Sequence, residues 1–260
     1  GVSVHNYTFT YSWENKGNAL GFNEDEYFSL IEHGMRMDEI VTKHGAIMDK
    51  YDPQKRIAMI VDEWGAWYNV EPGTNPGFLF QQNTLRDALL AGTILNIFHK
   101  HCDRVKIANI AQLVNVLQAL FLTEGDKMLL TTTYHVFDMY KVHQDATMLP
   151  IEIISPTYSR LGKEIKSVSA SASKDANGKI HVSFVNIDPN QSVDITCNIK
   201  DLKNAKLISG NIVTAAKTDS HNTFENPNEV MLKEFKDATI KNGVLNVKIP
   251  AKALVTVELN

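Results

Sequence analysis

One run of nine residues constrains the fold of this chain more than any other feature. Arg56–Trp64 reads R-I-A-M-I-V-D-E-W, a largely apolar stretch that closes with two neighbouring carboxylates. Such a run without alternation is typical of a strand buried on both faces, as in a parallel sheet covered by helices. Two acids at the end of a buried strand lose hydrating water, so they must be hydrogen-bonded or functional. The run therefore predicts a parallel strand with polar chemistry at its carboxyl end.

The segments around this strand alternate between strand and helix patterns. The other predicted strands are Val2–Tyr7 and Val105–Ile110, and the predicted helices are Glu24–Asp49, a segment from Thr84 through Ile97, and Tyr134–His143. Thr84 is a residue type that caps helices well, and apolar residues recur in the helical segments at helical spacing. A strand–helix–strand–helix order is typical of a βα-barrel.

The pattern changes beyond about Pro150. Ile180–Val185 and Val244–Val247 alternate between apolar and polar residues, which predicts strands with one buried face. Asn177-Gly178 and Asn242-Gly243 precede these two runs, and Asn-Gly supplies the positive φ angles that tight hairpins need. Residues 151–260 are therefore predicted to form an antiparallel β-sandwich, after an α/β part in residues 1–150.

The composition argues against several partners. The chain has 260 residues, a formal net charge of −4 and no cluster of Lys or Arg, so nucleic acid is not expected as a partner. The longest apolar runs, such as Ala88–Phe98, are too short to cross a bilayer of roughly 30 Å, so no membrane contact is expected. His99, His101, Cys102 and Asp103 fit no standard zinc spacing, and no metal is predicted there.

The local chemistry of Asp62–Tyr68 (D-E-W-G-A-W-Y) has two interpretations. Successive strand residues point to opposite faces, so only one of Asp62 and Glu63 should face a central pocket. An acid in this position is about as often part of a buried salt bridge as catalytic. The nearby aromatic residues could pack against the apolar faces of a sugar or belong to the core.

The string D-E-W-G-x-W-Y resembles the nucleophile strand of the α-L-arabinofuranosidases of glycoside hydrolase family 51. Ser3-Val4-His5-Asn6-Tyr7 resembles the S-x-H-x-Y string at the end of that family's sixth barrel strand. Other similar segments are Glu71–Phe78, Asp103–Asn115, Thr133–Phe137 and His221–Pro227. Together they span nearly the whole chain in one consistent order.

This resemblance implies a fold and a set of site residues. Residues 1–150 would hold strands six to eight of a (β/α)₈ barrel, and residues 151–260 a β-sandwich. Because the match begins at the sixth strand, we expect a piece of a longer enzyme. The implied roles are nucleophile for Glu63, orientation or sugar binding for His5 and Tyr7, and walls of the arabinose pocket for Trp64, Trp67 and Gln112.

The resemblance also implies a mechanism. Glu63 would attack the anomeric carbon of a terminal arabinofuranosyl residue of arabinan or arabinoxylan and form a glycosyl–enzyme, with net retention. No metal or organic cofactor is required. A second carboxyl group is needed roughly 5–5.5 Å away. In the family this acid lies in an N-E motif on the fourth strand, and neither Asn23-Glu24 nor Asn228-Glu229 ends a buried strand.

We therefore expect residues 1–260 to lack the acid/base and to need an N-terminal segment as a partner for activity. The sequence leaves open whether the protein forms homo-oligomers. Two alternatives remain beside the arabinofuranosidase hypothesis. The same fold and mechanism could serve a xylosidase or an endoglucanase, because contacts from other strands set the sugar specificity. The chain could also be a non-catalytic carbohydrate-binding or assembly module.

Overall fold

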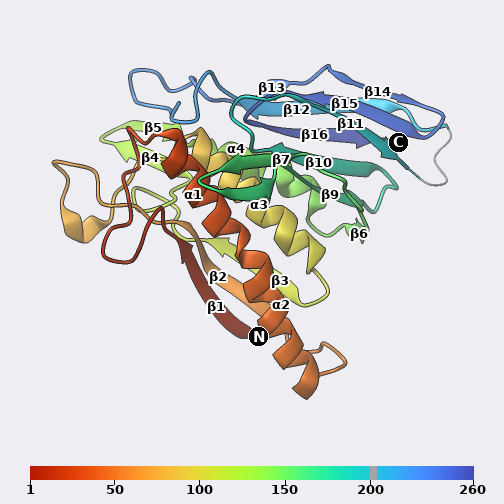
Figure 1. Ribbon diagram of the computed structural model, residues 1–260, viewed down its shortest axis with the longest axis horizontal. Coiled ribbons are helices and arrows are strands. Elements are labelled where there is room, and N and C mark those ends of the chain that lie inside the picture. Colours follow the sequence, from red (N-terminus) through yellow and green to blue (C-terminus); the bar gives the residue numbers. More distant parts are fainter. Residues whose placement is uncertain (200–203) are drawn as a thin grey trace.

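The computed structural model describes residues 1–199 and 204–260, which begin with a small parallel sheet (Figure 1). Its strands, in the order β1-β2-β3, are β1 (Val2–Thr8), β2 (Met59–Ala66) and β3 (Val105–Ile110). The helices α1 (Glu24–Met35) and α2 (Met37–Tyr51) connect β1 to β2, and α3 (Leu85–Lys100) connects β2 to β3. The α/β class predicted for this part is confirmed. Its three parallel strands and helical crossovers form an open sheet, as expected for part of a barrel.

The second half of the chain is built from two antiparallel sheets. A six-stranded sheet has the order β13-β12-β16-β10-β9-β6, and a three-stranded sheet has the order β11-β15-β14. The strands are β6 (Thr147–Leu149), β9 (Val168–Lys174), β10 (Ile180–Asn186), β11 (Val193–Asn198), β12 (Leu207–Thr214), β13 (Lys233–Glu234), β14 (Ala238–Lys241), β15 (Val244–Ile249) and β16 (Ala253–Leu259). Val182 and Phe184 of the first sheet share one core with Leu245 and Val247 of the second. The predicted β-sandwich is confirmed, and the division at residue 150 stays a prediction.

Shorter elements lie in the connections between these sheets. They are η1 (Pro76–Phe78), β4 (Phe121–Glu124), β5 (Lys127–Leu130), α4 (Thr132–Tyr140), η2 (Lys141–His143), β7 (Thr157–Arg160) and β8 (Lys163–Lys166). The strands β4 and β5 form a two-stranded hairpin, as do β7 and β8. The hairpin of β4 and β5 is not among the elements predicted from the sequence.

Local sequence signals explain where several elements begin. Thr84 caps α3 through a capping box with Asp87, as its residue type predicts. The helical segment that begins at Glu24 consists of two helices that meet at Arg36. Asn242 and Gly243, with φ angles of 53° and 79°, form the tight turn between β14 and β15.

Helix α3 joins the two halves of the molecule, because it lies between the parallel sheet and the six-stranded sheet (Figure 1). It contacts β2 on one side and β9 and β10 on the other. The approach to β16 is close, since a Cβ atom on Gly92 would lie 2.3 Å from Leu254 Cδ2. Residues such as Val61 and Leu254, from opposite halves, therefore belong to one apolar core.

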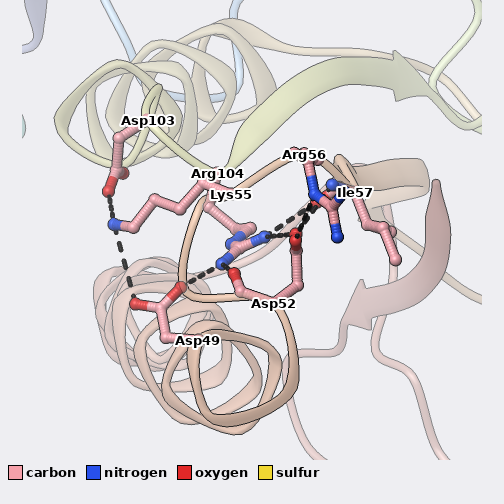
Figure 2. A network of polar contacts seen from close by, with 7 residues as sticks. All are labelled: Asp49, Asp52, Lys55, Arg56, Ile57, Asp103 and Arg104. Carbon is pink, nitrogen blue, oxygen red and sulfur yellow. Dashed lines mark hydrogen bonds and ion pairs between the residues drawn. The ribbon is translucent and has the colours of Figure 1, made fainter.

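Ion pairs close the amino end of the parallel sheet (Figure 2). The side chain of Arg104, only 3% exposed, donates from Nη1 to Asp52 Oδ2 at 2.9 Å and pairs through Nη2 with Asp49. Lys55 bridges Asp49 and Asp103 beside it. The network ties the end of α2 to the start of β3, and polar residues at this end of βα-barrels serve stability rather than catalysis.

A buried polar cluster lies where α3 and η2 meet the six-stranded sheet. His99 Nδ1 lies 2.9 Å from Ser171 Oγ. His143 lies 2.7 Å from Ser173 Oγ through Nδ1 and 2.7 Å from Ser183 Oγ through Nε2. These contacts satisfy the polar groups that the two halves bury against each other. Burial lowers the pKa of His99 to about 4 and that of His143 to about 3.

We expect this cluster to make the protein less stable in mild acid. The two folded-state pKa values lie below the ordinary value of about 6.5, so the unfolded chain takes up protons first as the pH falls below 6.5. Between pH 7.5 and pH 5, each histidine should remove roughly 2 kcal/mol from the free energy of unfolding. Urea unfolding at the two pH values measures this loss.

Two variants serve as a matched pair for this measurement. His143→Gln should reduce the loss of stability between pH 7.5 and pH 5, whereas His44→Gln, on an exposed residue of α2, should leave it unchanged. An equal loss in wild type and His143→Gln would contradict the prediction.

Two kinds of feature are not found in the part of the chain that the structure describes. None of its helices combines the length and the apolar character needed to span a bilayer. Within residues 1–199 and 204–260, no group of three or more His, Cys, Asp or Glu side chains could hold a metal ion.

Candidate active site

The carboxyl ends of β1 and β2 bring together residues that are far apart in the sequence. The two strands pair in parallel, and His5 lies opposite Glu63 in the register. Tyr7 Oη donates to Glu63 Oε2 at 2.7 Å, and His5 Nδ1 lies 3.5 Å from the same oxygen. The side chain of Glu63 is 40% exposed. This position, at the carboxyl ends of parallel strands, is where βα-barrels place their catalytic groups.

The prediction that only one of the two acids faces the site is wrong. Between Ser3 and His5 the register on β2 advances from Ile60 to Glu63, so β2 has one more residue than β1. This β-bulge breaks the alternation of side chains that a regular strand would have, and bulges often re-aim side chains next to active sites. Asp62 consequently lies on the same face as Glu63.

Asp62 makes two contacts with β1 on this face. Its Oδ1 accepts a hydrogen bond of 2.7 Å from Ser3 Oγ and lies 3.2 Å from His5 Nε2. His5 therefore stands between two carboxylates, with Nε2 beside Asp62 and Nδ1 beside Glu63. Ser3 belongs to the string Ser3–Tyr7 that resembles the family, but no role was predicted for it from the sequence.

The surroundings bias the protonation of two of these groups. The hydrogen bond from Ser3, helped by the charge of His5, holds the pKa of Asp62 below its usual range. Burial and the hydrogen bond to Glu63 raise the pKa of Tyr7 well above its ordinary value. Tyr7 therefore stays a neutral donor, and Asp62 stays an anion. An acid that is already ionised cannot protonate a leaving group, so Asp62 does not fit the role of general acid.

The prediction that Trp64 lines the pocket is wrong. Its side chain is fully buried and packs between Phe98 of α3 and Phe137 of α4, with ring centroids 5.3 and 6.2 Å away. Trp64 follows Glu63 directly and points to the helix-covered face of the sheet, as strand alternation requires. The core interpretation also holds for Tyr68, which is 2% exposed and donates to Asp87 Oδ1 at 2.9 Å.

Trp67 is part of an aromatic group beside the site. Its ring centroid lies 5.0 Å from that of Tyr7 and 5.3 Å from that of Trp13, both in edge-to-face geometry. Lys16 Nζ lies 4.7 Å from the centroid of the Trp13 ring and 5.1 Å from that of Trp67. Trp13 is 58% exposed. Sequence reasoning missed Trp13 and Lys16. Aromatic residues at every second position from Tyr7 to Trp13 were a signal for Trp13, whereas no pattern pointed to Lys16.

Gln112 lies just beyond the end of β3. The backbone N–H of Ala111 donates to Trp64 O at 3.0 Å, which continues the pairing of β2 and β3 to that point. Gln112 itself is exposed. Since the strands are parallel, it lies at the same edge of the sheet as Glu63. Its role in sugar binding stays a prediction.

Gly65 shapes the backbone next to Glu63. Its φ angle of +124° is strained for any residue with a side chain. A Cβ atom there would lie 2.7 Å from Gln118 Cγ and 3.2 Å from Ile110 Cδ1. Gln118 cannot easily move, because it is 1% exposed and its Nε2 donates to Asp87 Oδ1 at 2.8 Å. Only glycine fits this position without a shift of its neighbours.

Gly65→Ala should therefore lower the free energy of unfolding by about 2–4 kcal/mol, through backbone strain and overpacking. Gly73→Ala is the matched control, because Gly73 has a φ angle of +83° but no atom within 4 Å of the added Cβ. In the control, the free energy of unfolding should fall only by the cost of placing a side chain at a positive φ angle, about 1–2 kcal/mol. Equal losses in the two variants, measured by urea unfolding, would show that the contact with Gln118 costs nothing.

Comparisons with known proteins identify the family of this chain. A family model described as the α-L-arabinofuranosidase C-terminal domain matches residues 62–253. An intracellular exo-α-L-arabinofuranosidase of Bacteroides ovatus is 49% identical over 260 residues, which make up 100% of this chain and 50% of that protein. The chain thus spans about half the length of the curated relative.

Solved structures show the same half-length match. The crystal structure of the GH51 arabinofuranosidase from Xanthomonas axonopodis pv. citri is 43% identical with a TM-score of 0.97, over 99% of this chain and 52% of that one. The arabinose complex of the Thermotoga maritima α-L-arabinofuranosidase has a TM-score of 0.80 at 22% identity, over 98% of this chain and 52% of that one. At that identity the second match bears on the fold alone.

Proposed function

Since this chain belongs to the α-L-arabinofuranosidases of glycoside hydrolase family 51, we propose that it is the C-terminal part of a retaining enzyme that removes terminal α-L-arabinofuranosyl residues from arabinan or arabinoxylan. The observation that carries the proposal is the contact of Glu63 with Tyr7 and His5 at the carboxyl ends of paired strands. Relatives named exo-α-L-arabinofuranosidases support the substrate class.

Glu63 acts as the nucleophile in this proposal. Its Oε2 accepts from Tyr7 and faces His5, so Oε1 is the oxygen that attacks the anomeric carbon. The C–O bond to the leaving group breaks as the bond to Oε1 forms, and water later releases the sugar with net retention. Trp67 and Gln112 bind the sugar beside Glu63. No metal or organic cofactor takes part.

The acid/base carboxyl group comes from outside residues 1–260. Asp62 and Glu63 both contact His5, but the lowered pKa of Asp62 does not suit proton donation. Asn23 of the first Asn-Glu pair caps α1, and Glu24 is the first residue of that helix, so this pair does not end a strand. The family's N-E motif on the fourth barrel strand is the source that we propose.

A segment with the preceding barrel strands would complete the fold as well as the chemistry. In the described residues, β1 and β3 each pair with β2 alone, and Val2 and Ile107 on these edge strands are each 46% exposed. Unpaired edges with exposed apolar residues are normally covered in stable proteins. We propose that strands one to five of the barrel cover them, as part of the same enzyme.

Covalent trapping tests the proposed function directly. An activated 2-fluoro or cyclophellitol-type arabinofuranose analogue, added to the full-length protein, should label Glu63, and peptide mapping locates the adduct. An adduct on Asp62 or elsewhere would contradict the assignment. Hydrolysis of nitrophenyl arabinofuranoside, compared with the xyloside and with cellulose, separates the arabinofuranosidase from a xylosidase or an endoglucanase.

The non-catalytic alternative makes a different prediction. If the chain is a carbohydrate-binding module, arabinan should slow the migration of residues 151–260 alone in affinity electrophoresis. The trapping reagent should then leave Glu63 unlabelled. If labelling fails and the sandwich retains the affinity of the full chain, the binding module is the better description.

A further inference from the structure

We propose that Asp62 is a positioning residue, which acts through His5 to fix the nucleophile Glu63. The inference rests on the proposed function and concerns the acid that the family resemblance left without a role. Asp62 lies on the face of Glu63 only because of the β-bulge in β2. A bulge at this point disrupts the ladder between β1 and β2. The side chain of Asp62 contacts Ser3 and His5 of β1 at the same point.

The geometry forms a chain of four side chains. Ser3 Oγ donates to Asp62 Oδ1 at 2.7 Å, and the same oxygen lies 3.2 Å from His5 Nε2. On the other side of the ring, His5 Nδ1 lies 3.5 Å from Glu63 Oε2. Asp62 is an acceptor only, so it favours a proton on Nε2 and thereby sets the rotation of the imidazole ring.

The fixed ring has a consequence for Glu63. The side chain of His5 is 50% exposed, so packing alone does not hold it in place. With Nε2 held by Asp62, Nδ1 faces Oε2, the oxygen that also accepts from Tyr7. When the ring donates from both nitrogens, it brings positive charge to this side of the carboxylate. Oε1 is then left as the attacking oxygen.

A double-mutant cycle in the full-length enzyme tests whether Asp62 acts through His5. Asp62→Leu should lower kcat on an activated aryl arabinofuranoside by about 10²-fold, the cost of misplacing a catalytic group by roughly 1 Å, with little change in KM. Asp62→Asn keeps an acceptor oxygen and should lose less. In a His5→Gln background, Asp62→Leu should have no further effect, because the residue through which it acts is gone.

The controls separate positioning from a general loss of structure. Asp126→Leu, at the exposed turn between β4 and β5, should leave kcat unchanged. The thermal midpoints of all variants are measured beside the kinetics. If the effects of Asp62→Leu and His5→Gln multiply, or if Asp62→Leu stays within about twofold of wild type, the proposal is overturned.

A spectroscopic measurement tests the link between Asp62 and His5 independently of the substrate. The ¹⁵N chemical shifts of His5, assigned with His5→Gln, report which ring nitrogen carries a proton. They should show a proton on Nε2 in wild type and a changed distribution in Asp62→Leu. Identical shifts in the two proteins would overturn the link between Asp62 and His5. A wild-type enzyme with these shifts but no arabinofuranosidase activity would instead refute the proposed function.

Discussion

Replacing Glu63 with Gln should lower kcat of the full-length enzyme by at least about 10⁴-fold, the scale of the loss when an enzyme's nucleophile is removed. The amide keeps the size of the carboxylate and can still accept from Tyr7, so the site should stay folded. What it loses is the negative charge at Oε1 and therefore the ability to form the glycosyl–enzyme. Steady-state hydrolysis of nitrophenyl arabinofuranoside measures the effect.

Two observations test the cause of this loss. Glu124→Gln, on the exposed hairpin of β4 and β5, should keep full activity. In Glu63→Ala, azide can occupy the space of the lost carboxylate and attack in its place, so it should restore product formation with inverted anomeric configuration. Retained activity in Glu63→Gln, or rescue with retained configuration, would rule out Glu63 as the nucleophile.

Residues 1–260 on their own should hydrolyse arabinofuranosides at least about 10²-fold more slowly than a polypeptide that also carries the preceding barrel strands. A positioned general acid contributes about 10²–10⁴-fold, and the pKa of Asp62, the acid that precedes Glu63 in the sequence, is lowered, which is the wrong direction for a general acid. The open edges of β1 and β3 should also make the separate chain prone to association.

Reconstitution tests this expectation. The 260-residue chain is purified alone and assayed with and without an added segment that contains strands one to five. Size-exclusion chromatography, run in parallel, follows whether the two polypeptides associate. Full activity from a monodisperse, isolated chain would refute the prediction and the proposed source of the acid/base.

The sequence by itself determined the classes of structure and the position of the nucleophile strand. The apolar run before Asp62 predicts a strand of a parallel sheet, and β2 lies between two parallel strands with helices packed against it. Residue types that act locally were equally informative. Thr84 caps α3, and Asn242-Gly243 turns the chain between β14 and β15, because these effects depend on neighbours within a few residues.

Only the tertiary structure decided which side chains face the site. Strand alternation predicts opposite faces for Asp62 and Glu63, but pairing with β1 inserts a bulge that brings both acids to His5. A bulge is a property of the register between two strands, which a single strand's sequence does not contain. Trp64 could not be assigned for a similar reason, since its burial depends on Phe98 in a helix distant in the sequence. The sequence carries the chemistry of this site, and the pairing of distant strands decides which groups can take part in it.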